Sequence, residues 1–399
     1  MSAGPRVAVV GVGNRAHLGQ QVPEAWPGAA VVAAVDPDHH GRARARSLFG
    51  AGTAVHADVA ALVAAGGVDA ALVTTPDDTH ARLAIQLLRA GVAVLVDKPL
   101  ATTTADADAV LVAARETGTP LYVGHNLRHW EVVRVMHDAI ARGEIGEVRA
   151  VWVRHFVGNG GDYFFKDWHA DRRRSGSLLT QKASHDIDVV HHLAGAYTSR
   201  VVGMGDLMVY GDITDRRERP GEIAPDWTSH AHWPPRALTG LNPVVDVEDL
   251  SMLMMRLENG VLASYQQCHF TPDYWRSYTV IGTEGRLENA GDTGGAVVRV
   301  WNRRLGWSPT GHVEHPVRDI AGGHRAADTA MLTEFFAHVL HGAPTAGSPV
   351  DARQAVAVGS LGAESLRHGC VPLDVPPLPA GTAPPRRAAR HRPRDSADD

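Results

Sequence analysis

Residues 6–38 read RVAVVGVGNRAHLGQQVPEAWPGAAVVAAVDPD: an apolar run, a glycine-rich turn, a helix-length segment and a second apolar run that ends in an acid. This order predicts a strand–helix–strand unit. Gly11 permits a sharp turn after the strand at 7–10, and Gly13 lets backbone amides approach a diphosphate. Ala16 keeps the helix close to the strand. The stretch therefore predicts a dinucleotide site, with the diphosphate at the helix N-terminus.

Asp36 closes the second apolar run, where its carboxylate can accept hydrogen bonds from the adenosine ribose hydroxyls. A 2′-phosphate there would meet a like charge, so NAD is favoured over NADP. Arg15 and Arg42 are close enough in sequence to weaken this preference, which keeps NADP possible. A glycine turn without a ligand is the rival explanation, because GxGxxA alone is a weak signal. The strand, the helix-length segment and the acid together favour the nucleotide site.

The length and composition bound the class of protein. A chain of 399 residues predicts two domains. The net charge is −5 and no basic stripe interleaves with aromatics, so we expect no nucleic-acid partner. We find neither a secretory leader nor an apolar run of about 20 residues, and expect no membrane span. Cys268 and Cys370 offer neither a disulfide framework nor a zinc cluster, which favours a reducing, cytoplasmic location.

Further apolar runs at 68–75, 92–96 and 121–123 alternate with helix-length segments. This alternation predicts an α/β domain over residues 1–125, a Rossmann domain with a doubly wound parallel sheet. Ligands of such sheets bind beyond the C-terminal ends of the strands. The residues that fall there, and that we expect at the cofactor, are Gly11, Gly13, Asn14, Arg15, Thr75, Pro76, His80, Asp97, Lys98 and Asn126.

Strands dominate the second part of the chain, and residues 126–375 are predicted to form an α+β domain with a large, mostly antiparallel open sheet. The expected strands are 147–157, 200–210, 249–257, 261–270, 277–281 and 297–301, and 158–161 is expected to be a loop.

Three other segments are distinctive. Residues 211–245 are too long for an ordinary connection, which predicts an active-site lid or a partner-contacting excursion. Helices within 324–368 are expected to return to the first domain. The Pro- and Arg-rich tail, 376–399, is predicted to be disordered.

Lys98 follows a buried strand and precedes a proline, so a rigid turn directs its ammonium toward the expected nicotinamide position. A single helix predicted over 177–194 contains QKASHDID and places Gln181, Lys182, His185 and Asp188 on adjoining parts of one face. Such groups can pass protons near neutral pH. A solvated turn lysine and an ordinary helix histidine are the alternatives. In the preceding loop, the residues that could contact a substrate are Asp162, Tyr163, Lys166 and Trp168.

Several histidines and one aspartate are candidate metal ligands. His185, Asp188 and His192 have helical spacing, and His230 and His232 alternate along a possible strand. No HExxH-type motif links them, so we expect no required metal. His191 and His192 are expected to be packing or surface residues.

The motifs GVGNRA, TPDDTH, DKP and QKASHDID, with SYTVIGTEGRLE at 277–288, resemble those of the Gfo/Idh/MocA oxidoreductases over residues 5–370. These are NAD(P)-dependent enzymes that act mainly on sugars, cyclitols and related polyols. The resemblance implies that Lys98 contacts cofactor and substrate and that His185 is the acid/base on the reacting oxygen. Gln181 stands where many members have an aspartate, and Lys182 looks like the lysine of a Lys-x-x-His subgroup that could handle the proton instead. Asp97 replaces the family's glutamate.

This resemblance favours hydride transfer between NAD and a secondary alcohol or ketone of a sugar or cyclitol, with Lys98, His185 and Lys182 as catalytic residues. Tyr163, Trp168 and Asp188 are added as candidate substrate contacts. One alternative is a glycoside-cleaving enzyme that recycles its cofactor, and another is a non-catalytic NAD sensor or scaffold. The resemblance also implies a homo-oligomer, a dimer or tetramer, through the second-domain sheet. The substrate, the reacting carbon and the direction stay open.

Overall fold

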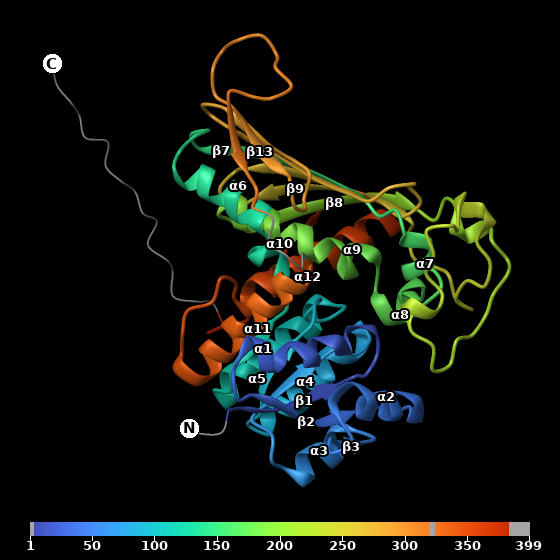
Figure 1. Ribbon diagram of the computed structural model, residues 1–399. Coiled ribbons are helices and arrows are strands. Elements are labelled where there is room, and N and C mark those ends of the chain that lie inside the picture. The colour runs from blue at the N-terminus through green and yellow to red at the C-terminus, as the bar shows by residue number, and fades with distance from the viewer. Residues whose placement is uncertain (1–3, 319–323, 383–399) are drawn as a thin grey trace.

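The first sheet is parallel, with its six strands in the order β3-β2-β1-β4-β5-β6 (Figure 1). The computed structural model describes residues 4–318 and 324–382. The order reverses beside β1, which places a ligand crevice at the ends of β1 and β4. The predicted doubly wound sheet is confirmed. Its strands are β1 (Arg6–Val10), β2 (Ala30–Val35), β3 (Ala54–His56), β4 (Ala70–Val73), β5 (Ala93–Val96) and β6 (Leu121–Val123).

Short polar side chains begin several helices of this domain. Asp38, Asp58 and Thr103 accept backbone N–H groups at the starts of α2, α3 and α5, which satisfies donors that would otherwise lack partners. The segment after the glycine turn is a 3₁₀ helix, η1 (Asn14–Gln21), followed by α1. The α-helices are α1 (Val22–Ala25), α2 (His39–Phe49), α3 (Val59–Ala65), α4 (His80–Arg89) and α5 (Thr104–Thr117).

The second sheet has nine strands in the order β14-β13-β12-β11-β7-β10-β9-β8-β15. Only β7 and β10 pair in parallel among its described strands, so the predicted mostly antiparallel sheet is confirmed. The strands are β7 (Val148–Phe156), β8 (Thr198–Asp206), β9 (Leu250–Leu257), β10 (Leu262–Cys268), β11 (Trp275–Gly282), β12 (Arg286–Ala290), β13 (Val297–Trp301), β14 (Val313–Pro316) and β15 (Leu373–Asp374).

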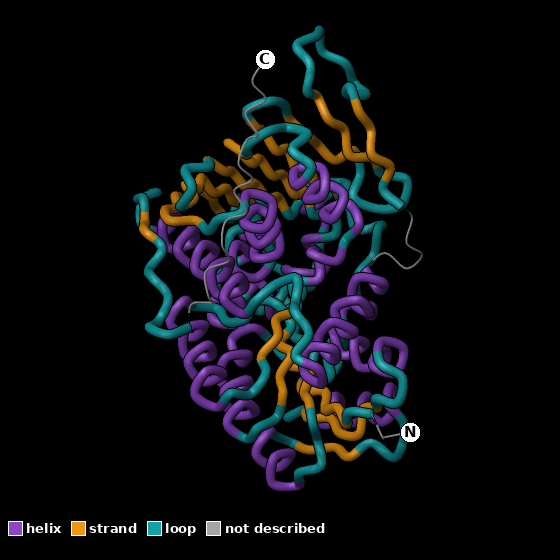
Figure 2. Tube along the Cα trace, turned by 90° about the vertical axis from the view of Figure 1, so that its left-hand side faces the viewer, coloured by secondary structure: helices purple, strands orange, loops and turns teal. Residues whose placement is uncertain are grey.

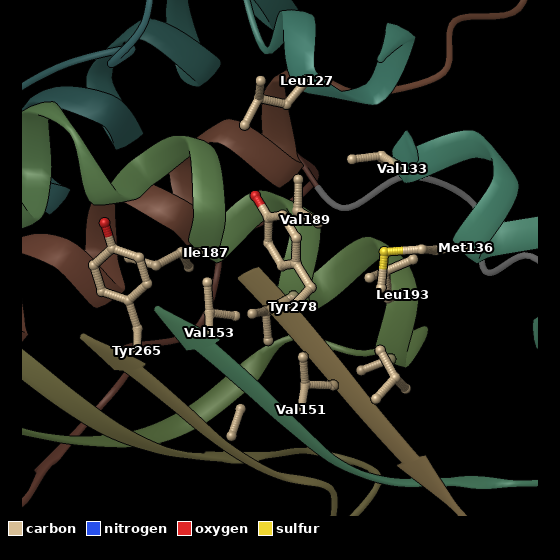
Figure 3. Close-up of a cluster of buried hydrophobic side chains, with 14 of the residues drawn as sticks. Leu127, Val133, Met136, Val151, Val153, Ile187, Val189, Leu193, Tyr265 and Tyr278 are labelled. Atoms are coloured by element: carbon tan, nitrogen blue, oxygen red, sulfur yellow. The ribbon is translucent and has the colours of Figure 1, made fainter. Parts of the chain in front are cut away.

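Helices cover one face of this sheet and lie between it and the first domain (Figure 2). They include α6 (Glu131–Ala141), α10 (Ala183–Ala194) and α12 (Pro349–Arg367). Figure 3 shows the packing: Val151, Val153 and Tyr278 of the sheet meet Ile187 and Val189 of α10. Each fully buried apolar side chain contributes about 1.5–3 kcal/mol. This core fixes the orientation of α10, and therefore of the polar residues on its other side.

Two long helices near the C-terminus connect the domains. Phe335 and Phe336 of α11 (His324–His341) pack into the core that contains β1, while α12 contacts both α5 and β8. Part of the tail also contacts this region, because Arg353 donates to the backbone oxygens of Pro376 and Pro377. Residues 376–382 are thus held in place, in contrast to the disorder predicted for 376–399; residues 383–399 lie outside the described part of the chain. Within that described part, no helix is both long and apolar enough to cross a membrane.

Candidate active site

A cavity of about 1140 Å³ lies between the two domains. Of the residues that the sequence places at the cofactor, Ala16 is the exception: it is fully buried beside β1, as its packing role requires. The others line the cavity: Gly11, Gly13, Asn14, Arg15, Asp36, Thr75, Pro76, His80, Asp97, Lys98 and Asn126. The structure therefore brings these predicted residues together at one site.

The glycine turn fits a dinucleotide. Gly11 has a φ of +92°, and a Cβ there would lie 2.6 Å from the Thr75 side chain, so only glycine is accommodated. A Cβ on Gly13 would meet nothing within 4 Å, which leaves the cavity side of its backbone open to a diphosphate. Asp36 accepts the backbone N–H groups of Val12 and Asp38 at 2.8 and 2.9 Å, which fixes its carboxylate at the ribose end.

Arg15 and Arg42 are both engaged by protein groups. Arg15 pairs with Asp97 and Asp328 at 2.9 Å each, and Arg42 donates to the backbone oxygens of Asp36 and Pro37 at 2.8 Å. Both guanidinium groups thus have protein partners, and the expectation that they weaken the preference for NAD stays a prediction. Arg15 instead anchors Asp97, the residue that precedes Lys98.

His80 organises the turn around Lys98. Its two ring nitrogens lie 2.7 and 2.8 Å from the backbone oxygens of Pro99 and Thr75, so the ring bridges two strand ends. Asn126 donates to Asp328 at 2.8 Å, beside the Arg15 pair. These contacts hold the edge of the site where Lys98 projects.

Lys98 reaches the second domain, where its Nζ donates to the backbone oxygen of Gln181 at 2.9 Å. The helix predicted over 177–194 is wrong in one respect: it is divided into α9 (Leu178–Gln181) and α10 by a turn at Lys182. The turn lets Lys182 enter the cavity, where its Nζ lies 5.7 Å from the Phe164 ring centroid. His185 also lines the cavity, and its Nδ1 has no hydrogen-bond partner among the described residues.

Burial controls the charge of these groups. It places the pKa of His185 well below its usual value, and the nearby Lys98 and Lys182 add to the effect. The pKa of Lys182 is also well below its usual value, first because of burial and then because of Arg276 and Lys98. Burial lowers the pKa of Lys98 too, although Asp77 and Asp97 oppose it. His185 is therefore a neutral proton acceptor at pH 7, beside two amines that exchange protons more readily than exposed lysines.

The positions of the lysines also single out this cavity. The chain has only three lysines, Lys98, Lys166 and Lys182, and all three line this cavity. Arginine supplies every other strongly basic side chain, and a guanidinium cannot lose its proton in a protein. All lysine amines of the chain therefore lie at this one cavity. This count is available from the sequence and would have strengthened the selection of Lys182.

Asp188 is not a cavity residue. Its two carboxylate oxygens accept from Nε and Nη2 of Arg128 at 2.7 Å each, and its side chain is 1% exposed. The predicted substrate contact is therefore not supported, because α10 turns this residue away from His185. Among the described residues, the side chains found grouped with metal-ligand spacing are Asp38, His39 and His40, not His185, Asp188 and His192. We read Asp188 as a structural partner of Arg128.

The loop before α9 forms a wall of the cavity. Tyr163 and Trp168 line it, as expected, and are joined by His169, Phe164 and Tyr274. The segment predicted as a loop at 158–161 enters a short helix, α7 (Gly160–Phe164). No motif in the sequence singles out the three added residues. Asp162 is not among the lining residues, and its carboxylate pairs with Lys166, which does line the cavity, at 2.5 Å.

Models of one protein family match nearly the whole chain. The description "Oxidoreductase family, NAD-binding Rossmann fold" (Gfo/Idh/MocA) applies to residues 5–125, and its C-terminal alpha/beta domain matches residues 137–375. The chain belongs to the Gfo/Idh/MocA oxidoreductases. The resemblance read from the motifs is confirmed, as is the NAD-binding first domain; assignment to the Lys-x-x-His subgroup stays a prediction.

Relatives of this Gfo/Idh/MocA protein include 1,5-anhydro-D-fructose reductase of Ensifer adhaerens, 30% identical over 57% of this chain and 58% of the relative. Inositol 2-dehydrogenase 2 of Saccharopolyspora erythraea is 30% identical over 59% and 58%. The chain thus spans about three fifths of these relatives' length. Levoglucosan dehydrogenase in complex with NADH and levoglucosan shares the fold at 19% identity, with a TM-score of 0.76 and coverage of 94% and 100%.

Proposed function

We propose that this Gfo/Idh/MocA protein is an NAD-dependent oxidoreductase that transfers hydride between nicotinamide and a secondary alcohol or ketone of a sugar or cyclitol. The observation that supports it best is the meeting of Lys98, Lys182 and His185 in the cavity that also contains the dinucleotide turn. The named relatives act on compounds of this class.

The charges of the site determine which residue accepts the substrate's hydroxyl proton. In the oxidising direction, neutral His185 accepts the hydroxyl proton while the ammonium of Lys98 stabilises the alkoxide that develops. When bound at the glycine turn, NAD would supply the oxidant: its nicotinamide would accept the hydride with its two electrons, leaving the substrate carbon as a carbonyl. The nearby amine of Lys182 takes the proton-handling place that a carboxylate at position 181 has in many relatives, because Gln181 cannot accept a proton near neutral pH.

Incubation of the purified chain with NAD and a panel of sugars and cyclitols tests this function. We expect NADH to form with at least one secondary alcohol, and NADPH to form much more slowly when NADP replaces NAD. NAD binding without turnover on any polyol would contradict the enzyme and support the sensor alternative. Sugar release without net NADH would instead favour the recycled-cofactor reaction.

The outer face of the second sheet is proposed to bind another copy of this chain. It exposes large apolar side chains on adjacent strands, and the register places Trp152, Ser264 and Met254 in one row across it. Met204 and Met252 pair in the next row on the same face, and are 60% and 41% exposed. An apolar patch of this kind is typical of an interface.

Met254→Lys would place an ammonium in that interface, so we expect the dissociation constant of the oligomer to rise about hundredfold. Sedimentation or light scattering at several concentrations measures this. Val63→Lys, on α3 of the first domain, is the matched control and should leave the mass unchanged. A monomeric wild-type chain at all concentrations would overturn the proposal.

A further inference from the structure

We propose that residues 211–245, here called the strap, complete the cofactor site from the second domain and retain the bound dinucleotide between turnovers. The proposal rests on NAD being the cofactor of the proposed function. In Figure 1 the strap is the yellow-green excursion that extends from the second domain toward the first. Of the two predicted roles of this segment, a lid or a partner-contacting excursion, the proposal takes the lid.

Two hydrogen bonds fasten the strap to the first domain. The backbone N–H of Ala224 donates to Asn14 Oδ1 at 2.7 Å, and Arg44 Nη2 donates to the backbone oxygen of Gly221 at 2.6 Å. Asn14 belongs to the dinucleotide turn, and Arg44 also donates to the backbone oxygen of Val12 within that turn. The strap is therefore bound to the part of the protein that holds the diphosphate and ribose.

The strap lies so close to α2 that one of its residues must be glycine. Gly221 has a φ of +76°, and a Cβ there would lie 2.6 Å from the His40 ring. A side chain at this position would strain the backbone and push the strap away from α2. The contact is thus built into the sequence of the strap.

The strap also forms part of the cavity wall. Residues 219–223 line the same cavity as Gly13, Asp36 and Gly41, which surround the expected adenosine ribose. The ribose end of the dinucleotide is therefore bounded by first-domain residues and by the strap. Release of the dinucleotide requires the strap to leave Asn14 and Arg44.

The strap residues that follow Ala224, at 227–229, are anchored on the loop that lines the substrate side. Asp162 accepts the backbone N–H of Ser229 at 2.8 Å, and Trp227 Nε1 donates to the Asp162 backbone oxygen at 3.0 Å. Asp162 also pairs with Lys166, and it directly precedes the cavity residue Tyr163. Strap opening is thereby linked mechanically to the substrate loop, so the cofactor leaves when that loop is also disturbed.

The release rate of NADH from the full-length chain tests the strap. Rapid mixing of the NADH complex with excess NAD gives this rate from the loss of nucleotide fluorescence. Ala224→Pro removes the N–H that binds Asn14, and the extended backbone of Ile223 together with the helix start at Ala224 accommodates proline. We expect release to accelerate about tenfold, as for loss of one partly buried hydrogen bond. Ala224→Gly keeps the N–H and is the matched control, with a rate within about twofold of wild type.

A second variant and a label-free measurement guard against a folding defect. Gly221→Ala places a Cβ 2.6 Å from the His40 ring, which pushes the strap away from α2 and should also accelerate release about tenfold. In the wild-type chain, amide hydrogen exchange of residues 220–224 should slow when NADH binds. Unchanged release in both variants with no slowing of exchange would overturn the strap while leaving the oxidoreductase intact. A wild-type chain that binds neither NAD nor NADH would overturn the proposed function itself.

Discussion

Lys98→Met is expected to lower kcat for NAD reduction by about 10³-fold, with the affinity for NAD retained within about tenfold. The loss follows from removing the ammonium that stabilises the developing alkoxide, while the glycine turn and Asp36 still hold the dinucleotide. Methionine has nearly the length of lysine and keeps its packing, while the hydrogen bond from Lys98 Nζ to the Gln181 backbone oxygen is lost. Steady-state kinetics and NAD titration of the same preparation measure both effects. Turnover within tenfold of wild type would refute the assignment of Lys98.

The pH profile separates a catalytic Lys98 from a structural one. Neutral His185 is the proton acceptor, and its lowered pKa means that activity is lost only as pH falls below the usual histidine range. Charged Lys98 is needed at high pH, and its lowered pKa places the alkaline decline below the usual value of 10.5. Lys98→Met should remove this alkaline decline. Lys98→Arg is the matched control for charge, and we expect poor rescue because a guanidinium has a different shape and proton affinity.

The sequence predicted the first domain well because its signals are local. Buried parallel strands are continuous apolar runs, and a glycine turn followed by an acid at the next strand end has few other uses. Lys98 was selected correctly as a cavity residue for the same reason, since a strand end and a proline direct its side chain. These features need no knowledge of distant contacts.

Local sequence patterns predicted the second domain less well. Helical spacing suggested that Asp188 shares a face with His185, but its direction depends on Arg128, which is distant in sequence. No glycine or proline stands beside Lys182 to indicate a turn there. The strap was recognised as unusual from its length alone, whereas its contact with Asn14 follows from the packing of the two domains. Each of these features depends on tertiary contacts that a single sequence does not display.

Arg128→Met is expected to lower the free energy of unfolding by about 3–5 kcal/mol. Arg128 donates twice to Asp188 and once to the backbone oxygen of Ala346, and it lies 3.5 Å from Asp351. It therefore joins the segment that directly follows the first domain to α10 and α12. Without it, the carboxylate of Asp188 is left buried beside His125 alone, and burying an unpaired charge is costly. Urea unfolding followed by circular dichroism measures the change.

Two comparisons identify the cause of that loss. Arg128→Met combined with Asp188→Asn removes the buried charge as well, so it should recover part of the stability lost in the single variant. In the wild-type chain, burial raises the pKa of Asp188, but Arg128 outweighs it and the net pKa is lowered. This lowered pKa gives stability that is present above the unfolded-state pKa and lost as pH falls through the folded-state value. In Arg128→Met the unpaired carboxylate favours its protonated form, so the stability deficit should shrink on acidification. A deficit that is independent of pH and of Asp188→Asn would show that packing, rather than the ion pair, is what Arg128 provides.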